Sequence, residues 1–218
     1  MPRLLFEKTG DSIWMSHLDL MRVFQRAFKR AGLPLTHTQG FNPRPSVSIA
    51  LPLSVGVSSR CELLDFDLEG EWKNFADIAG RLNEKLVSGV RVLDAYETGA
   101  KIRNLAFLDC KLSLSYDRGF PDGAPDDIRA LFARSELLVE KHSKNGVQQQ
   151  DIIPMIRQLT VEQEGNMLFL NARVCCQNPT LNPMQLSAAI DRFLPELKPD
   201  FVRCERIEIY DQNNHIFR

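Results

Sequence analysis

The sequence lacks the features that mark membrane proteins, disulfide-linked proteins and simple metal proteins. No apolar run approaches the length of a membrane span, and no apolar region of the signal-peptide type stands at the N-terminus. The cysteines are odd in number and irregularly spaced, without a Cys-x-x-Cys pair, so their spacing supports neither a zinc site nor a disulfide framework. They are Cys61, Cys110, Cys175, Cys176 and Cys204. These absences predict a cytoplasmic protein without a membrane segment, a metal site or a cofactor.

Acidic residues are missing from one long segment, between Leu20 and Cys61, although the net charge of the 218-residue chain is −1. Acidic residues follow directly, in residues 62–71. The basic residues of the acid-free segment are Arg22, Arg26, Lys29, Arg30, Arg44 and Arg60. The total charge gives no signal for nucleic acid, but this segregation allows a basic face.

The elements that are present predict an α+β fold. In each half of the chain they follow the order strand, helix, strand, strand, helix, strand, which is typical of a ferredoxin-like (βαββαβ) unit with an antiparallel sheet. We therefore expect two tandem ferredoxin-like domains, 1–100 and 101–218, the second modified by an inserted β segment. The expected helices are 17–31, 71–86, 126–134 and 184–193, with a helical turn at 151–156. The expected strands are 3–6 (continuing at 13–15), 46–51, 61–68, 90–96, 105–116, 137–142, 159–164, 167–175 and 201–210.

The helix expected at 17–31 has the clearest local signals. Ser16 and Asp19 form a Ser-x-x-Asp capping pattern, and Gly32 followed by Pro34 predicts the end of the helix. Its apolar residues fall on one side at helical spacing, and its cations fall on the other. These cations are Arg22, Arg26, Lys29 and Arg30. Such a row suits contact with the phosphates of RNA. The alternatives are a solvated surface, or pairing with residues 62–71 or with an acidic partner.

Residues 39–45, Gln-Gly-Phe-Asn-Pro-Arg-Pro, form a loop because two prolines and several turn-forming residues exclude a helix. The functional interpretation is an RNA-binding loop, in which Phe41 stacks on a base and Arg44 holds a phosphate. Gln39 and Asn42 would then read base edges. The alternative is a rigid connection between a helix and a strand.

Four further features allow weaker functional interpretations. His17 is a candidate general acid or base at a helix start, although a packed imidazole bonded to the backbone is the favoured interpretation. His37 lacks the further ligands that a metal site needs. Lys141 and Lys144, with Asp151, form a charged turn or a second phosphate contact. For the adjacent pair Cys175-Cys176, we expect one thiol in the core and the other exposed.

Two motifs, Ser-His-Leu-Asp-Leu-Met-Arg at 16–22 and Gln-Gly-Phe-Asn-Pro-Arg-Pro at 39–45, resemble those of a bacterial family, the radical SAM-linked domain of unknown function (DUF2344). Residues 51–57 and the segment from Lys141 to Pro154 also match it. The resemblance implies RNA metabolism or modification beside a separately encoded radical SAM protein, and an association with RNase E/G-type ribonucleases. The chain lacks the Cys-x₃-Cys-x₂-Cys of a radical SAM cluster, so that chemistry would reside in another chain.

The leading hypothesis is a non-catalytic RNA-binding accessory protein that holds structured RNA, such as rRNA or tRNA, for a radical SAM enzyme. One alternative is a metal-independent ribonuclease or RNA-modifying enzyme that uses His17. Another is a protein-interaction module whose basic face docks on an acidic partner surface.

Overall fold

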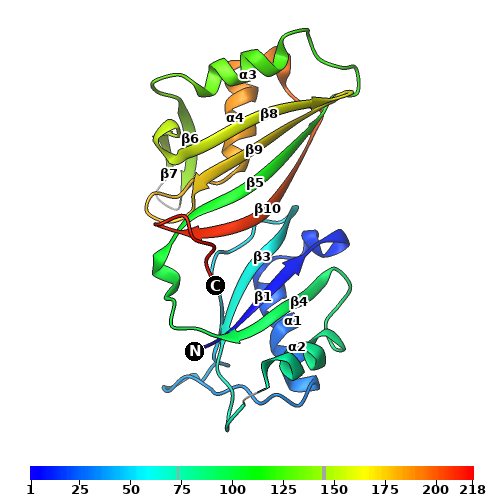
Figure 1. The fold of residues 1–218 in the computed structure, drawn as a ribbon, viewed down its shortest axis with the longest axis vertical. Helices are drawn as coiled ribbons and strands as arrows, with labels where there is room; N and C mark the ends of the chain where they lie inside the picture. Colours follow the sequence, from blue (N-terminus) through cyan, green and yellow to red (C-terminus); the bar gives the residue numbers. More distant parts are fainter. Residues whose placement is uncertain (73, 144–145) are drawn as a thin grey trace. The chain divides into compact units, whose positions relative to one another are not determined.

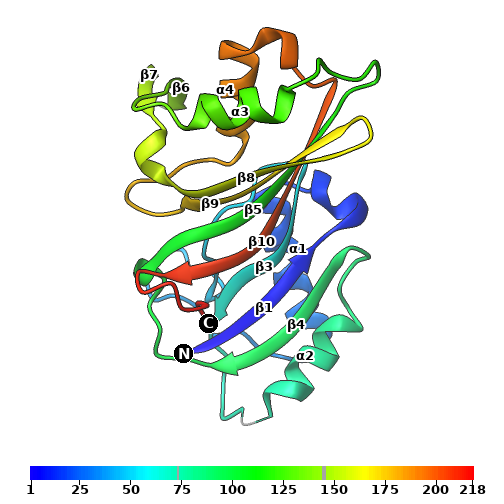
Figure 2. The ribbon, with the colours of Figure 1, turned by 45° about the horizontal axis from the view of Figure 1, so that its top comes forward.

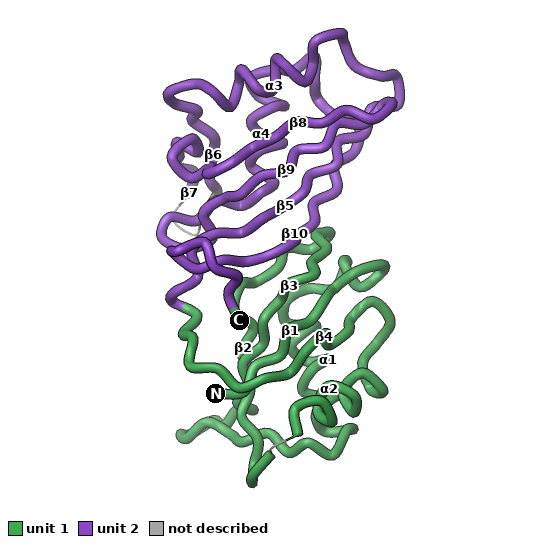
Figure 3. The backbone as a smooth tube through the Cα atoms, viewed as in Figure 1, with its two compact units in different colours: residues 1–102, 218 green, residues 103–217 purple. Residues whose placement is uncertain are grey.

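The computed structural model describes residues 1–72, 74–143 and 146–218, and the predicted α+β class with antiparallel strand pairing is confirmed. The chain divides into two compact units, unit 1 (residues 1–102 with Arg218) and unit 2 (residues 103–217), shown in Figure 3. We predicted a boundary between residues 100 and 101. That each unit folds as an independent domain stays a prediction.

Unit 1 consists of four antiparallel strands and two helices within its described residues. They are β1 (Pro2–Lys8), α1 (His17–Arg30), β2 (Val47–Ile49), β3 (Val57–Phe66), α2 (Phe75–Asn83) and β4 (Val90–Glu97), with a 3₁₀ helix η1 (Gly10–Trp14). The strand order is β4-β1-β3, and β2 pairs with β3. Figures 1 and 2 place α1 and α2 on the same side of this sheet.

The core of unit 1 lies between the two helices and the sheet. Leu20, Phe24, Ala27 and Phe28 of α1 are buried, as the helical periodicity predicted. The ring of Phe24 meets Phe6 of β1 edge-on at 4.7 Å, and the ring of Phe28 lies 5.1 Å from Phe66 of β3. Burial of each such ring contributes about 1.5–3 kcal/mol. The apolar stripe of α1 is therefore used by the sheet, and its other face is left to solvent.

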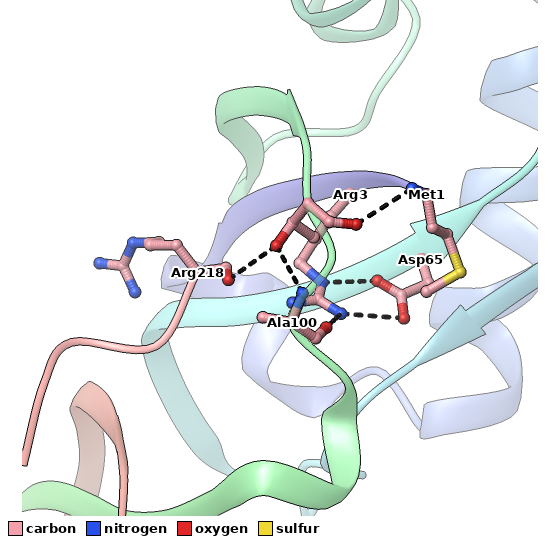
Figure 4. A network of polar contacts seen from close by, with 6 residues as sticks. Met1, Arg3, Asp65, Ala100 and Arg218 are labelled. Atoms are coloured by element: carbon pink, nitrogen blue, oxygen red, sulfur yellow. Dashed lines mark hydrogen bonds and ion pairs between the residues drawn. The ribbon is translucent and has the colours of Figure 1, made fainter. Parts of the chain in front are cut away.

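One end of the opposite face of this sheet carries a polar network near the chain termini (Figure 4). Arg3 of β1 donates from Nε and Nη2 to the carboxylate of Asp65 at 2.6 and 3.2 Å, and from Nη2 to the carbonyl of Ala100 at 2.9 Å. Thr98 donates from its hydroxyl to the main-chain oxygen of Arg218 at 3.1 Å. The Arg3 side chain is completely buried as a result.

Unit 2 repeats the same strand order with an insertion. Its elements are β5 (Leu105–Ser115), α3 (Ala124–Phe132), β6 (Leu138–Ser143), β7 (Gly146–Asp151), β8 (Ile156–Glu164), β9 (Met167–Cys175), α4 (Met184–Phe193) and β10 (Phe201–Asp211). Short 3₁₀ helices lie at Ile102–Asn104, Ile153–Met155 and Pro195–Leu197. The main sheet has the order β10-β5-β9-β8, all antiparallel, and β6 pairs with β7 in a separate hairpin inserted between α3 and β8.

The main sheet of unit 2 is one-sided. Along β5 and β9 buried residues alternate with half-buried ones, which is the period of a strand with one covered face. The buried set includes Leu108, Leu112 and Leu170. Figures 1 and 2 show α3 and α4 on one side of this sheet, so the half-buried residues line the other side.

Three boundaries in unit 1 differ from the prediction. Residues 13–15 are not a strand, because Nζ of the buried Lys8 donates to the carbonyls of Ile13 at 3.1 Å and Met15 at 2.9 Å and so stabilises the η1 turn. α2 begins at Phe75 and not at 71, since the Asn74 side chain accepts from the Asp77 amide and caps the helix there. β3 begins at Val57 and not at 61.

In unit 2 the strand β7 was missed. Its residues Gln148–Gln150 are polar and lack the alternation that predicts a strand, but they pair in register with β6. The predicted turn at Lys144-Asn145 lies outside the described residues. The predicted helical turn at 151–156 is the 3₁₀ helix Ile153–Met155.

Candidate nucleic-acid interface

Helix α1 is held at both ends by the predicted caps. The hydroxyl of Ser16 accepts from the Asp19 amide at 3.2 Å and donates to the Asp19 carboxylate at 2.7 Å. At the other end Gly32 has φ +66°, and the Leu33 amide donates to the Phe28 carbonyl at 3.0 Å, which closes a Schellman motif. Because both ends of α1 are capped and its apolar side is buried against the sheet, the side of the helix that carries the cations faces solvent.

The four cations on that face are not equivalent. Arg22 forms an ion pair with Asp19 at 2.9 Å, and Arg30 donates from Nη2 to the Lys85 carbonyl at 2.7 Å. Hydrogen bonds from Ser16 and then from Arg22 lower the pKa of Asp19 below its usual value. The remaining two, Arg26 and Lys29, are exposed and form no ion pair with the residues that the structure describes.

No ion pair joins any of these four cations to the acidic segment 62–71 in the described part of the chain. The alternative that these cations pair with residues 62–71 of the same chain is therefore not supported. Two uncompensated positive charges, those of Arg26 and Lys29, stay available to a ligand.

The loop at 39–45 is exposed and closed at its base. The Thr38 amide donates to the Arg44 carbonyl at 2.9 Å, and the Arg44 amide donates to the Thr38 hydroxyl at 3.1 Å. Gln39, Phe41, Asn42 and Arg44 are all exposed, and Phe41 at 107% exposure is as open as a side chain in an extended peptide. An aromatic ring that packs on nothing in its own unit fits the predicted role in stacking.

A groove of about 580 Å³ connects the helix face to the base of the loop. Lys29 of α1 lines one wall, and His37 with Pro45 lines the other. Gln25 lies one helical turn before Lys29 and shares its wall. Sequence reasoning missed Gln25, although the spacing of four residues to Lys29 was visible. The structure thus brings Lys29 to the base of the loop, in a groove that Glu69 also lines, while Arg22, Arg26 and Arg30 do not line it.

His17 is the first residue of α1. It is half-buried, and its Nδ1 atom is buried without a hydrogen-bond partner in the described part of the structure. The expected backbone hydrogen bond is therefore not made by Nδ1. Across residues 1–72, 74–143 and 146–218, no group of three or more His, Cys, Asp or Glu side chains could hold a metal ion. The site can bind an anion, but none of the described residues forms a hydrogen bond with His17 that would make an acid–base pair.

The second predicted contact, in unit 2, is only partly described. Lys141 of β6 is half-buried opposite Gln148, and Lys144 lies outside the described residues. Asp151 has a structural role, because its Oδ1 accepts the amides of Leu137 at 2.9 Å and Ile153 at 3.1 Å. These bonds close the base of the hairpin.

The expectation for Cys175-Cys176 is wrong, since both side chains are buried. The Cys176 amide donates to the Ala106 carbonyl at 2.9 Å, which holds the residue against the start of β5. Burial raises the pKa of the Cys176 thiol to about 11, so it is a poor nucleophile at neutral pH.

Comparisons with known proteins give a fold likeness and a family. The structure titled "Crystal Structure of a Cbf5-Nop10-Gar1 Complex" matches with a TM-score of 0.52 at 10% identity, over 95% of this chain and 48% of that chain. The chain thus spans about half the length of this neighbour, and the likeness shows the fold alone. "Crystal Structure of an Unknown Protein from Galdieria sulphuraria" has a TM-score of 0.27 at 13% identity, over 94% of this chain and 96% of that chain. The comparison with curated proteins finds no match.

Within the described residues, every helix is too short or too polar to cross a membrane. The sequence profile of one family matches residues 2–183, which is most of the chain. The chain belongs to this family, described as "Uncharacterized protein conserved in bacteria (DUF2344)".

Proposed function

We propose that the chain is a non-catalytic RNA-binding accessory protein, and that the outer face of α1 with the 39–45 loop is its RNA-binding surface. The observation that carries the proposal is the pair of uncompensated cations on the outer face of α1, Arg26 and Lys29, of which Lys29 lines the groove that leads to the base of the exposed loop. Phosphates would contact these cations and Arg44. The open ring of Phe41 would stack on an unpaired base.

We further propose that the two units are tandem ferredoxin-like units. The strand orders support this: in each unit the fourth strand lies beside the first, the first beside the third, and the third beside the second. In this arrangement both crossover helices lie on one side of the sheet, so that the outer face of α1 is free to bind a ligand.

The proposed setting is structured RNA, rRNA or tRNA, together with a separately encoded radical SAM protein or an RNase E/G-type ribonuclease. The motifs at 16–22 and 39–45 support this setting through the family resemblance. Both motifs contribute exposed residues to the proposed surface, such as Arg22 and Phe41.

Binding of RNA at several salt concentrations tests the proposal. The triple variant Arg26→Gln/Lys29→Gln/Arg44→Gln should bind more weakly, and the slope of log affinity against log salt should flatten by about 0.7–0.9 for each phosphate that the variant no longer neutralises. Arg91→Gln/Lys198→Gln removes exposed cations elsewhere and serves as the control. Wild-type affinity and slope in the triple variant would contradict the proposed surface, and tighter binding to an acidic protein than to RNA would favour a docking module.

A ribonuclease that uses His17 is the second candidate, because the Nδ1 atom of this side chain accepts or donates no hydrogen bond in the described part of the structure, but it would need a second acid or base beside His17. Incubation of purified protein with total RNA would then give cleavage that His17→Ala abolishes. Binding without any cleavage by the wild type would remove this candidate.

A further inference from the structure

Two adjoining pockets lie at one end of the open sheet face in unit 2. Their volumes are about 400 and 310 Å³, and they share Phe107, Arg157 and Gln212 as lining residues. Phe107 lies at the start of β5, and Arg157 lies in β8. All lining residues belong to unit 2, and they differ from the residues of the α1 surface.

The lining combines positive charge with amide groups. Its cations are Arg103, Arg157 and Arg173. Its primary amides are Gln158, Gln177, Asn178, Gln212 and Asn214. No carboxylate of the described residues lines either pocket. The pockets therefore attract an anion and offer both donors and acceptors to it.

Arg173 is held rigidly at the pocket wall. Its guanidinium donates two bonds to the carboxylate of Asp109 at 2.7 and 2.8 Å and one to Asn214 at 3.3 Å, and it lies 3.8 Å from the ring centroid of Tyr210. The hydrogen bonds to Asp109 raise the pKa of Arg173 above its usual value. A fixed donor loses little freedom when a ligand binds.

The other two arginines keep their charge available. Arg103 and Arg157 are exposed and form no ion pair with any residue in the described part of the chain. The Arg157 guanidinium lies over the Phe107 ring at 5.2 Å, so the two residues that line both pockets already form a cation–π contact.

We propose that these pockets bind an unpaired ribonucleotide. Arg103 and Arg157 hold its phosphate, the base stacks on the Phe107–Arg157 pair, and the amides of Gln158 and Gln212 bond to the edge of the base. An acidic peptide would use the arginines, but it offers no planar edge to the ring and the amides. The choice of RNA as the ligand rests on the proposed function. The pockets lie in unit 2, whereas the α1 surface lies in unit 1, so the two sites can be tested separately.

A labelled single-stranded uridine hexanucleotide is the probe, and fluorescence anisotropy is the readout. Arg157→Gln and Phe107→Leu should each weaken binding by about tenfold, the scale of one base stacked on an aromatic ring. Arg134→Gln is the matched control, since that arginine also lies over a ring, Phe193, at 5.7 Å, but lines neither pocket. Circular dichroism of each variant checks that it is folded.

The variant Arg26→Gln/Lys29→Gln separates this site from the α1 surface. In this background Arg157→Gln should still weaken binding of the hexanucleotide by about tenfold, even where the variant loses structured RNA. Uridine monophosphate distinguishes the two sources of the ligand: displacement of the hexanucleotide only at much higher concentration supports an RNA strand, and equal potency supports a free nucleotide in the same pocket.

Three results would overturn the inference. They are no binding of the hexanucleotide by the wild type, equal loss of binding in the Arg134→Gln control, and equal competition by a hexaglutamate peptide. If the hexanucleotide fails while structured RNA still binds through Arg26 and Lys29, the inference falls and the proposed function stands. If the hexanucleotide binds while structured RNA does not, the proposed α1 surface falls and the pocket stands.

Discussion

Both units place an arginine opposite an aspartate on adjacent strands, with bidentate bonds, but the two pairs have different surroundings. In unit 1 Arg3 of β1 faces Asp65 of β3, and in unit 2 Asp109 of β5 faces Arg173 of β9. The side chains of the first pair are 0% and 12% exposed, and the Arg173 and Asp109 side chains are 19% and 28% exposed. Equivalent strands therefore carry the same pair with the two residue types exchanged.

We infer from this difference that the Arg3–Asp65 pair stabilises unit 1, whereas the Asp109–Arg173 pair positions an arginine at the proposed binding pocket of unit 2. In unit 1 the segment at 98–100 and Arg218 close the sheet face around Arg3, as Figure 4 shows. The unit 1 cations that we assign to RNA binding, Arg26, Lys29 and Arg44, lie on α1 and on the 39–45 loop and not beside this pair. In unit 2 the corresponding face is open, and Arg173 lines a pocket beside two unpaired arginines.

Asp65→Asn should have the largest effect on stability. It leaves the buried guanidinium of Arg3 without its counter-ion, which costs about 3–5 kcal/mol. Both tryptophans, Trp14 and Trp72, lie in unit 1, so their fluorescence during urea unfolding reports on this unit. If the units are independent domains, circular dichroism should then show a second transition at higher urea.

Glu84→Gln, which changes an exposed carboxylate of the same unit, is the control and should be neutral. An Asp65→Asn variant as stable as this control would show that the buried pair is not a structural element of unit 1.

Asp109→Asn should lower the free energy of unfolding much less than Asp65→Asn does, by about 1 kcal/mol or less, because the Asp109–Arg173 pair is partly exposed to solvent. It should also tighten binding of the uridine hexanucleotide, since the pocket gains a net positive charge. Anisotropy titrations of the variant and the wild type measure this change. Weaker binding would mean that Asp109 matters more for fixing Arg173 than for its charge.

Gly32→Ala should destabilise unit 1 by about 1 kcal/mol, because the φ of +66° at the end of α1 is unfavourable for any residue with a Cβ atom. The new Cβ would also lie 3.0 Å from Nη2 of Arg81. Gly80→Ala within α2 is the matched control, since nothing lies near its Cβ and alanine favours a helix. Thermal unfolding should show a lower midpoint for the first variant and a higher one for the second.

The smallest effect concerns pH. The folded-state pKa of Asp19 is lowered below 3.8, so its contribution to stability is present above that pH and is lost as the pH falls through the folded pKa. The free energy of unfolding of Asp19→Asn should therefore fall less than that of the wild type below about pH 4. At pH 7 the variant should be less stable than the wild type. An identical acid decline in variant and wild type would contradict the pairing of Asp19 with Ser16 and Arg22.

Local signals predicted much of unit 1. The cap at Ser16, the end at Gly32 and the apolar period gave the bounds of α1 almost correctly, because each depends on neighbouring residues only. The 3₁₀ helix Gly10–Trp14 was not predicted, and residues 13–15 were predicted as a strand, because the helix is stabilised by Lys8, which donates to the carbonyls of Ile13 and Met15. Ile13-Trp14-Met15 by itself has the composition of a strand.

The candidate sites were harder to predict for the same reason. The cations of α1 were visible in the sequence, but the bond from Arg30 to the Lys85 carbonyl joins residues 55 positions apart. The pocket in unit 2 needs the register between β5 and β9, which brings Asp109 opposite Arg173. Residues 105–116 were predicted as a strand, but no local pattern shows which strand lies beside it or which of its faces is open.

Ultraviolet crosslinking of RNA to the protein in cells, followed by mass spectrometry of the attached peptides, tests most directly that each unit contributes its own RNA-binding site. We expect nucleotide adducts on the peptide that contains Phe41 in unit 1 and on the peptide that contains Phe107 in unit 2. Sequencing of the attached RNA would identify the ligand. Crosslinks confined to other peptides, or none from a protein that is present in the cell, would contradict the assignment of one RNA-binding site to each unit.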